Sequence, residues 1–163
     1  MGYGTFDHTA DIGIRAWGSE FSQVFEEAAK ALFSVIVDLK TVSPRQKVKI
    51  ELTKDSGEEL FLSWLKELLF IFETKHLLLS EFKIIDLNPA SSQSSPGFPP
   101  KDLADPPRNL AGNLGYCLIA EVRGEVLDNA KHSLGREVKA ITLHQFKLVH
   151  DQGRYLAEVI LDI

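Results

Sequence analysis

Residues 154–163 read RYLAEVILDI, an apolar run that stops on Asp162 and Ile163. Its content of apolar and β-branched side chains is typical of a strand in a packed sheet. The segment VKAITLHQFKLV (138–149) has the same character, and the glycine-bearing residues between the two segments have the composition of a hairpin loop. Terminal residues that take no part in a fold are usually short polar extensions. We therefore expect the last residues of this sequence to lie inside the sheet, with the Asp162 side chain beside the carboxylate of Ile163.

Two further segments have the periodicity of amphipathic helices. Apolar side chains recur at helical spacing over residues 20–38 after a capping Ser19, and Ser56 with Glu59 has the spacing of a capping box before a second apolar stripe. Strand-like segments surround the helices at 12–17, 47–54, 81–87 and 116–127. The sequence predicts an α+β fold of one domain, residues 1–163, with two amphipathic helices packed on a mainly antiparallel β-sheet.

The segment at about 89–113 differs in composition from the rest of the chain. Six of the seven prolines lie between Pro89 and Pro107, where they are mixed with serines. Such a segment cannot bury enough apolar surface to offset the entropy lost on ordering it. We predict a mobile loop within the single domain, because neither flank carries a second core.

The formal net charge is −5, and no basic stripe is visible in the sequence. Proteins that bind RNA or DNA alone neutralise phosphates with lysine and arginine, so we expect contact with RNA to be indirect. Neither G-x-x-x-x-G-K-[ST] nor a strand–helix G-x-G-x-x-G is present, so independent nucleotide binding has no motif. A secretory signal pattern and a membrane-length apolar run are also missing, and Cys117 is a single thiol in an apolar run. We expect a cytoplasmic protein without membrane contact.

Two acidic stretches are candidates for a divalent cation. DHTAD (7–11) combines two carboxylates, an imidazole and a hydroxyl before a strand, and hard cations prefer such oxygen ligands. The alternative is that the side chains of Asp7 and Thr9 stabilise a turn by forming hydrogen bonds with the nearby backbone. At the other end, Asp162 and the Ile163 carboxylate repel each other, and either a cation or solvent can relieve that repulsion.

The stretch from His132 through Lys139 to His144, which ends in KAITLH (139–144), supplies further candidates. In a regular strand Lys139 points to the opposite face from Thr142 and His144, so those three side chains could share a pocket only across a bulge. Lys139 is a candidate phosphate-binding or interface cation, although a lysine lying along a sheet is the commoner case.

From these residues alone, different classes of function stay open. One is a metal-dependent phosphoesterase or nuclease that uses Asp11 and Asp162 with His8 or His144 as general base. Another is a chaperone-like module that binds proteins through its sheet surface.

The sequence resembles the archease family over nearly its whole length. The resemblance is carried by DHTADIGI (7–14), FSQVFEEAAKALF (21–33), LFLSWLKELLF (60–70), GEVLDNAKH (124–132), EVKAITLH (137–144) and LAEVILDI (156–163). It implies an α+β protein that is not itself a catalyst. The implied role is that of a protein cofactor of the RtcB-type, GTP-dependent RNA ligase of tRNA splicing, whose guanylylation and multiple turnover it promotes.

The resemblance also implies a bound divalent cation, Ca²⁺ or else Mg²⁺ or Mn²⁺. Its expected ligands are Asp11, Asp162 and Ile163, the last through a backbone or terminal oxygen, with His8, Lys139 and His144 as possible interface or second-layer residues. The stretch NPASSQSSPGFPPKDLADPPRNLAG (88–112) looks like an insertion relative to a shorter family connection. Because loop lengthening costs only about 0.6 kcal/mol per doubling, we expect the fold to tolerate it.

Overall fold

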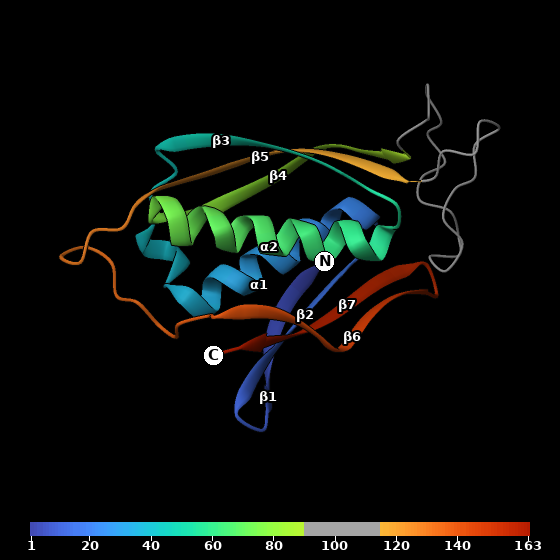
Figure 1. Ribbon diagram of the computed structural model, residues 1–163, viewed down its shortest axis with the longest axis horizontal. Helices are drawn as coiled ribbons and strands as arrows, with labels where there is room; N and C mark the ends of the chain where they lie inside the picture. The colour runs from blue at the N-terminus through green and yellow to red at the C-terminus, as the bar shows by residue number, and fades with distance from the viewer. Residues whose placement is uncertain (90–114) are drawn as a thin grey trace.

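Two helices form the middle layer of the part of the chain that the computed structural model describes, residues 1–89 and 115–163 (Figure 1). Helix α1 spans Phe21–Ile36 and α2 spans Gly57–Lys75, which confirms both predicted helices. Ser56 caps α2 as expected, because its side chain accepts a hydrogen bond from the Glu59 N–H. Helix α1 is capped one residue later than predicted, at Glu20, whose N–H donates to the side chain of Gln23.

The described strands form two antiparallel sheets. Sheet A has the order β1-β2-β7-β6, and sheet B has the order β3-β5-β4. The strands are β1 (Gly2–His8), β2 (Asp11–Gly18), β3 (Gln46–Lys54), β4 (Leu77–Pro89), β5 (Tyr116–Val126), β6 (Ala140–Asp151) and β7 (Arg154–Asp162). A short 3₁₀ helix, Leu39–Thr41, follows α1. Except for Pro89, the segment predicted to be a mobile loop lies outside the described residues, as does nearly all of the expected insertion.

The helices lie between the two sheets (Figure 1), so α1 contacts β2 of sheet A and β4 of sheet B, while α2 contacts β6 and sheet B. This arrangement explains why α2 is apolar over so wide an arc. At the centre of the layer the Trp64 indole of α2 is fully buried and donates to the Phe25 carbonyl oxygen of α1 at 2.9 Å. The α+β class with antiparallel pairing is therefore confirmed, and the strands are divided between two sheets.

Strand β1 was not predicted from the sequence. It forms a hairpin with β2, closed by Thr9 and Ala10, and Thr9 adopts a left-handed backbone with φ of 48°. At the end of α2, His76 has the same left-handed conformation, and β4 begins directly after it at Leu77, earlier than the predicted start at residue 81. Neither described helix combines the length and apolar character needed to span a bilayer.

Candidate metal centre

The hairpin β1–β2 positions the first half of the candidate site. His8 and Asp11 face each other as the last pair of the hairpin. Residues paired in this way project from the same face of a sheet. Next to them the ring of Phe6 lies over Gly13, where a Cβ atom would come within 2.1 Å of that ring. The hairpin therefore requires glycine at this position while Phe6 keeps its place.

The pairing of β2 with β7 brings the second half of the site to Asp11. Ile12 pairs with Leu161, so one step further along the antiparallel register Asp11 lies opposite Asp162. Cβ atoms of directly opposed residues are about 4.5–5.5 Å apart. On the other side, Asp162 pairs with Ala140 of β6. Two residues separated by 151 positions in sequence are thus neighbours in space, as we expected of the two ends of the chain.

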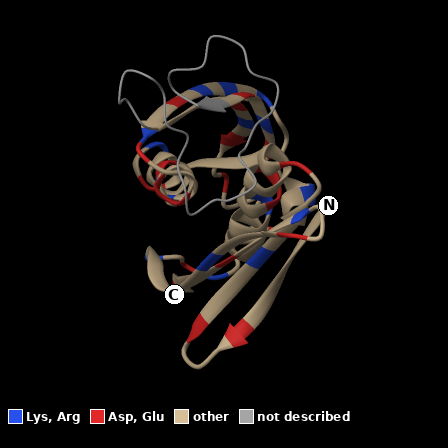
Figure 2. Ribbon diagram, turned by 90° about the vertical axis from the view of Figure 1, so that its right-hand side faces the viewer, with Lys and Arg blue, Asp and Glu red and all other residues tan. Residues whose placement is uncertain are grey.

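Both carboxylates lie on the face of sheet A that is turned away from the helices. Ile14 of β2 and Val159 of β7 pair with each other and are buried in the core, and Asp11 and Asp162 occupy the alternate positions. The two carboxylates are half-buried. Figure 2 shows acidic residues at the turn of the hairpin and the C-terminus beside it. We call Asp11 and Asp162 the acidic pair.

No Lys, Arg or His among the described residues forms an ion pair with the acidic pair. Two like charges at this spacing repel by about 1 kcal/mol in water and by more where they are partly shielded from it. A divalent cation relieves the repulsion, and oxygen is the donor that Ca²⁺, Mg²⁺ and Mn²⁺ prefer. The chemistry of the pair therefore fits a hard cation.

Within the described residues, no group of three or more His, Cys, Asp or Glu side chains is arranged to hold a metal ion. A third protein ligand, as the sequence predicts, would then come from the backbone of Ile163. Ile163 follows Asp162 directly, and its side chain packs against the core. Since Ca²⁺ takes about six to eight oxygen ligands, positions would stay open for water or other oxygen ligands.

The two candidate histidines meet at this site. The ring of His144, from β6, contacts the ring of His8 edge to face, with 5.5 Å between the ring centroids. The Nδ1 atom of His8 is buried without a hydrogen-bond partner among the described residues. Because His8 is the hairpin partner of Asp11, this imidazole pair borders the acidic pair.

Lys139 contacts the site through its backbone. Its N–H donates to the carbonyl oxygen of Asp162 at 2.7 Å, just before β6 begins at Ala140. Its side chain is exposed and forms no ion pair with the described acidic residues. Lys139 lies just before β6 and outside its register with β7, so the strand pairing does not set its side chain on one face with Thr142.

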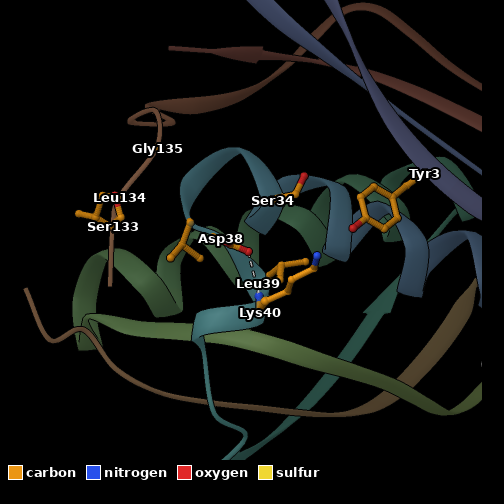
Figure 3. Close-up of a pocket in the computed structure, with 9 residues that line it drawn as sticks. Tyr3, Ser34, Asp38, Leu39, Lys40, Ser133, Leu134 and Gly135 are labelled. Atoms are coloured by element: carbon orange, nitrogen blue, oxygen red, sulfur yellow. Dashed lines mark hydrogen bonds between the residues drawn. The ribbon is translucent and has the colours of Figure 1, made fainter. Parts of the chain in front are cut away.

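A separate surface pocket of about 560 Å³ lies at the opposite end of β1 (Figure 3). Tyr3, at the start of the strand, lines it, whereas His8 of the candidate site is at the end of the strand. The other lining residues are Ser34, Val37, Asp38, Leu39, Lys40, Ser133, Leu134 and Gly135. This pocket includes none of the predicted metal ligands and none of His8, Lys139 and His144.

Comparison with known proteins shows to which family the chain belongs. The model of the archease protein family (MTH1598/TM1083) matches residues 3–163. The chain belongs to the archease family. Protein archease of Thermococcus gammatolerans is 33% identical over 97% of this chain and 96% of its own length. Protein archease of Methanopyrus kandleri is 32% identical over 100% of both chains.

Solved structures of the archease family agree with the fold. The solution structure of Methanobacterium thermoautotrophicum protein 1598 has 31% identity and a TM-score of 0.78, and the match covers 99% of each chain. A crystal structure of an archease from Thermotoga maritima, described as a possible chaperone, has a TM-score of 0.57. That match covers 97% of this chain and 94% of the other, and at 18% identity it supports the fold alone.

One polar cluster lies outside the acidic pair, in the GEVLDNAKH stretch that carries part of the archease resemblance. The Nδ1 atom of buried His132 accepts the Asp128 N–H at 2.9 Å, so its Nε2 carries the hydrogen donated to Glu125 Oε1 at 2.8 Å. The pKa of Glu125 is lowered to about 2. The largest cause is the Lys131 ammonium, and the next largest is the hydrogen bond from the Ser43 N–H. The sequence singled out His132 as the start of a candidate stretch but gave Glu125 no role, although a Glu and a His seven positions apart were a visible signal.

Proposed function

We propose that this chain is a non-catalytic protein cofactor of an RtcB-type, GTP-dependent RNA ligase in the cytoplasm. In this role it promotes guanylylation of the ligase and its multiple turnover in tRNA splicing and RNA repair. A divalent cation, Ca²⁺ or else Mg²⁺ or Mn²⁺, is held by Asp11, Asp162 and a main-chain oxygen of Ile163. Contact with RNA is indirect, through the ligase.

The observation that carries this proposal is the register of β2 and β7. It sets Asp11 against Asp162 on one face, with no cationic partner among the described residues. The two carboxylates repel each other unless a cation lies between them, and this repulsion supports a cation-binding role. Family membership supports the ligase role, since the resemblance to archease implies it.

A divalent cation at this position supplies charge neutralisation for phosphate groups during nucleotidyl transfer. The chain's own contribution is to hold the acidic pair rigidly. β2 and β6 flank β7 on both sides, and the Lys139 N–H fixes the carbonyl oxygen of Asp162. The exposed Lys139 side chain and the His8–His144 pair then border the cation and are available to a partner.

The test is guanylylation of the purified ligase with GTP, in the presence of the intact chain or of a variant. We expect Asp11→Asn and Asp162→Asn each to reduce the stimulation about tenfold or more, because each removes one charged ligand. Asparagine keeps the size of the side chain and removes its charge.

The matched control is Asp7→Asn. Asp7 is an exposed aspartate of the same hairpin, but it pairs with Ile12 and therefore projects from the other face of sheet A. Its variant should stimulate like the parent chain. Undiminished stimulation by Asp11→Asn and Asp162→Asn would refute the cation site as the working part of the molecule.

A metal-dependent phosphoesterase is the alternative that the His8–His144 contact favours, since an imidazole beside a metal can act as general base. It predicts cleavage of RNA by the purified chain with Mn²⁺ and without ligase. Our proposal predicts no turnover in that assay. A chaperone-like module would instead bind unfolded proteins whether or not a metal is present.

A further inference from the structure

Each sheet in the described part of the chain has two edge strands, β1 and β6 in sheet A and β3 and β4 in sheet B. An edge strand presents backbone N–H and C=O groups without a partner strand, and proteins block such edges with lysines, prolines or bulges. Strand β3 carries Lys47 and Lys49, and β4 has two register shifts and ends at Pro89. Strand β6 has a bulge between Thr142 and Lys147. Three of these edges are therefore protected against pairing.

The edge of β1 has none of these features. Its sequence, GYGTFDH, contains no lysine and no proline, and its register with β2 is regular over all seven residues. The hairpin that it forms with β2 projects away from the helical layer (Figure 1), and no strand among the described residues pairs with its outer edge. The occupant that can pair with the backbone of such an edge is another extended strand.

The exposed side chains of β1 are complementary to a second copy of β1 in antiparallel orientation. Tyr3, Thr5 and Asp7 occupy alternate positions and are all exposed, so they lie on one face of the strand. With a two-fold axis through Thr5, the two Thr5 side chains face each other and Tyr3 faces Asp7. Opposed threonines stabilise an antiparallel pair through their hydroxyl groups, and a tyrosine hydroxyl can donate to a carboxylate. This face of the strand therefore matches itself.

The other face of β1 agrees with the same register, because it sets Phe6 of one copy opposite Gly4 of the other. A Cβ atom at Gly4 meets no atom within 4 Å, so there is open space beside this glycine. An aromatic side chain opposite an edge glycine helps to fix the register of a sheet. Parallel pairing in register would instead set Asp7 beside Asp7, where like charges repel. The residues of β1 therefore favour the antiparallel orientation.

We propose that β1 pairs with β1 of a second copy of this chain, so that sheet A continues through both copies of a two-fold dimer. The interface is isologous, because the same strand serves both sides. Since Asp11 pairs with His8 at the end of β1, the acidic pairs of the two copies lie at opposite ends of the paired strands. One seven-residue strand per copy makes a small interface, so the dimer is weak and forms at high protein concentration.

The experiment measures the monomer–dimer equilibrium of the full chain by sedimentation equilibrium, at protein concentrations up to about 1 mM. We expect the parent chain to dimerise and Thr5→Lys to weaken dimerisation about tenfold or more, because two ammonium groups then face each other across the axis. Thr5→Glu should weaken it in the same way. An equimolar mixture of Thr5→Lys and Thr5→Glu should dimerise again, since opposite charges then face each other.

The matched control is Thr53→Lys. It adds the same charge at an exposed threonine of another edge strand, β3. It should dimerise like the parent chain. Thr5 is exposed, so its variants should keep the fold, and far-UV circular dichroism of each variant checks this.

A parent chain that stays monomeric at the highest concentration would overturn the proposal. Equal dimerisation of Thr5→Lys and Thr53→Lys would overturn it too, because the dimer would then use another surface. A monomeric parent chain that binds the purified ligase more tightly than Thr5→Lys does would assign the edge of β1 to a strand of the ligase instead. None of these variants alters the acidic pair, so failure of this proposal leaves the proposed function intact.

Discussion

Two acidic sites in this molecule are built in opposite ways. Glu125 is compensated by the chain itself, through an ion pair with Lys131 and hydrogen bonds from Ser43 and His132. The acidic pair, Asp11 and Asp162, has no such partner among the described residues. The first arrangement serves the fold, because it ties the segment after β5 to the segment after α1. Under the proposed function, a cation supplies the compensation that the second arrangement lacks.

The Glu125 cluster predicts acid sensitivity. Its donors lower the pKa of Glu125 from 4.5 to about 2, so the folded state keeps this carboxylate charged where the unfolded state already binds a proton. Its contribution to stability is therefore full above pH 4.5 and is lost as the pH falls from 4.5 towards 2. Urea unfolding at a series of pH values should show this loss in the parent chain and a flatter pH profile in Glu125→Gln.

His132→Gln is the companion variant, since it disturbs the packing of the cluster and keeps the Glu125 carboxylate. It should be less stable at neutral pH and still lose stability in acid. Identical pH profiles of the parent chain and Glu125→Gln would show that Glu125 has the same pKa in both states.

At the scale of elements, strands β4 and β5 approach each other unusually closely at Gly124. A Cβ atom built there would lie 1.7 Å from the carbonyl oxygen of Leu78, which is backbone and cannot rotate away. The β4 register shift between Leu79 and Glu81 lies at the same place. Glycine is therefore required by the close approach of two backbones.

We predict that Gly124→Ala lowers the free energy of unfolding by about 1–3 kcal/mol, because the two strands must move apart to admit the methyl group. Gly4→Ala is the control. Gly4 is also a strand glycine, but a Cβ there meets no atom within 4 Å, so its change should be close to neutral. Thermal unfolding of both variants measures the difference, and equal melting temperatures would contradict the close approach.

The elements that the sequence predicts well are those with a strong period. Ser56 and the apolar stripe after it define α2, and the mainly apolar run before Asp162, interrupted by Glu158, defines β7. Strand β1 was not predicted because GYGTFDH shows no apolar face in the sequence. One set of alternate residues contains both glycines, and the side chains of the other set are exposed. The bulge of β6 between Thr142 and Lys147 was not predicted either. The register of a strand depends on its partner strand, and this part of the sequence contains no residue typical of a turn.

At the scale of the whole molecule, the helices separate two sheets, and the N-terminal hairpin and the C-terminal strand share sheet A (Figure 1). The sequence indicated that Asp11 and Asp162 belong together only through the family resemblance. Composition and periodicity cannot supply this contact, because it depends on β7 lying between β2 and β6. The structure provides that order, and with it a physical reason why an acidic residue so close to the C-terminus is half-buried.

Calorimetric titration of Ca²⁺, Mg²⁺ and Mn²⁺ into the purified chain, without ligase, tests the acidic pair most directly. Our account predicts one cation per chain for at least one of these metals, with affinity lost about tenfold or more in Asp11→Asn, in Asp162→Asn and in a chain lacking Ile163. Asp7→Asn should titrate like the parent chain. Heats of binding that are the same for the parent chain and for Asp162→Asn would contradict the claim that a cation joins β2 to β7.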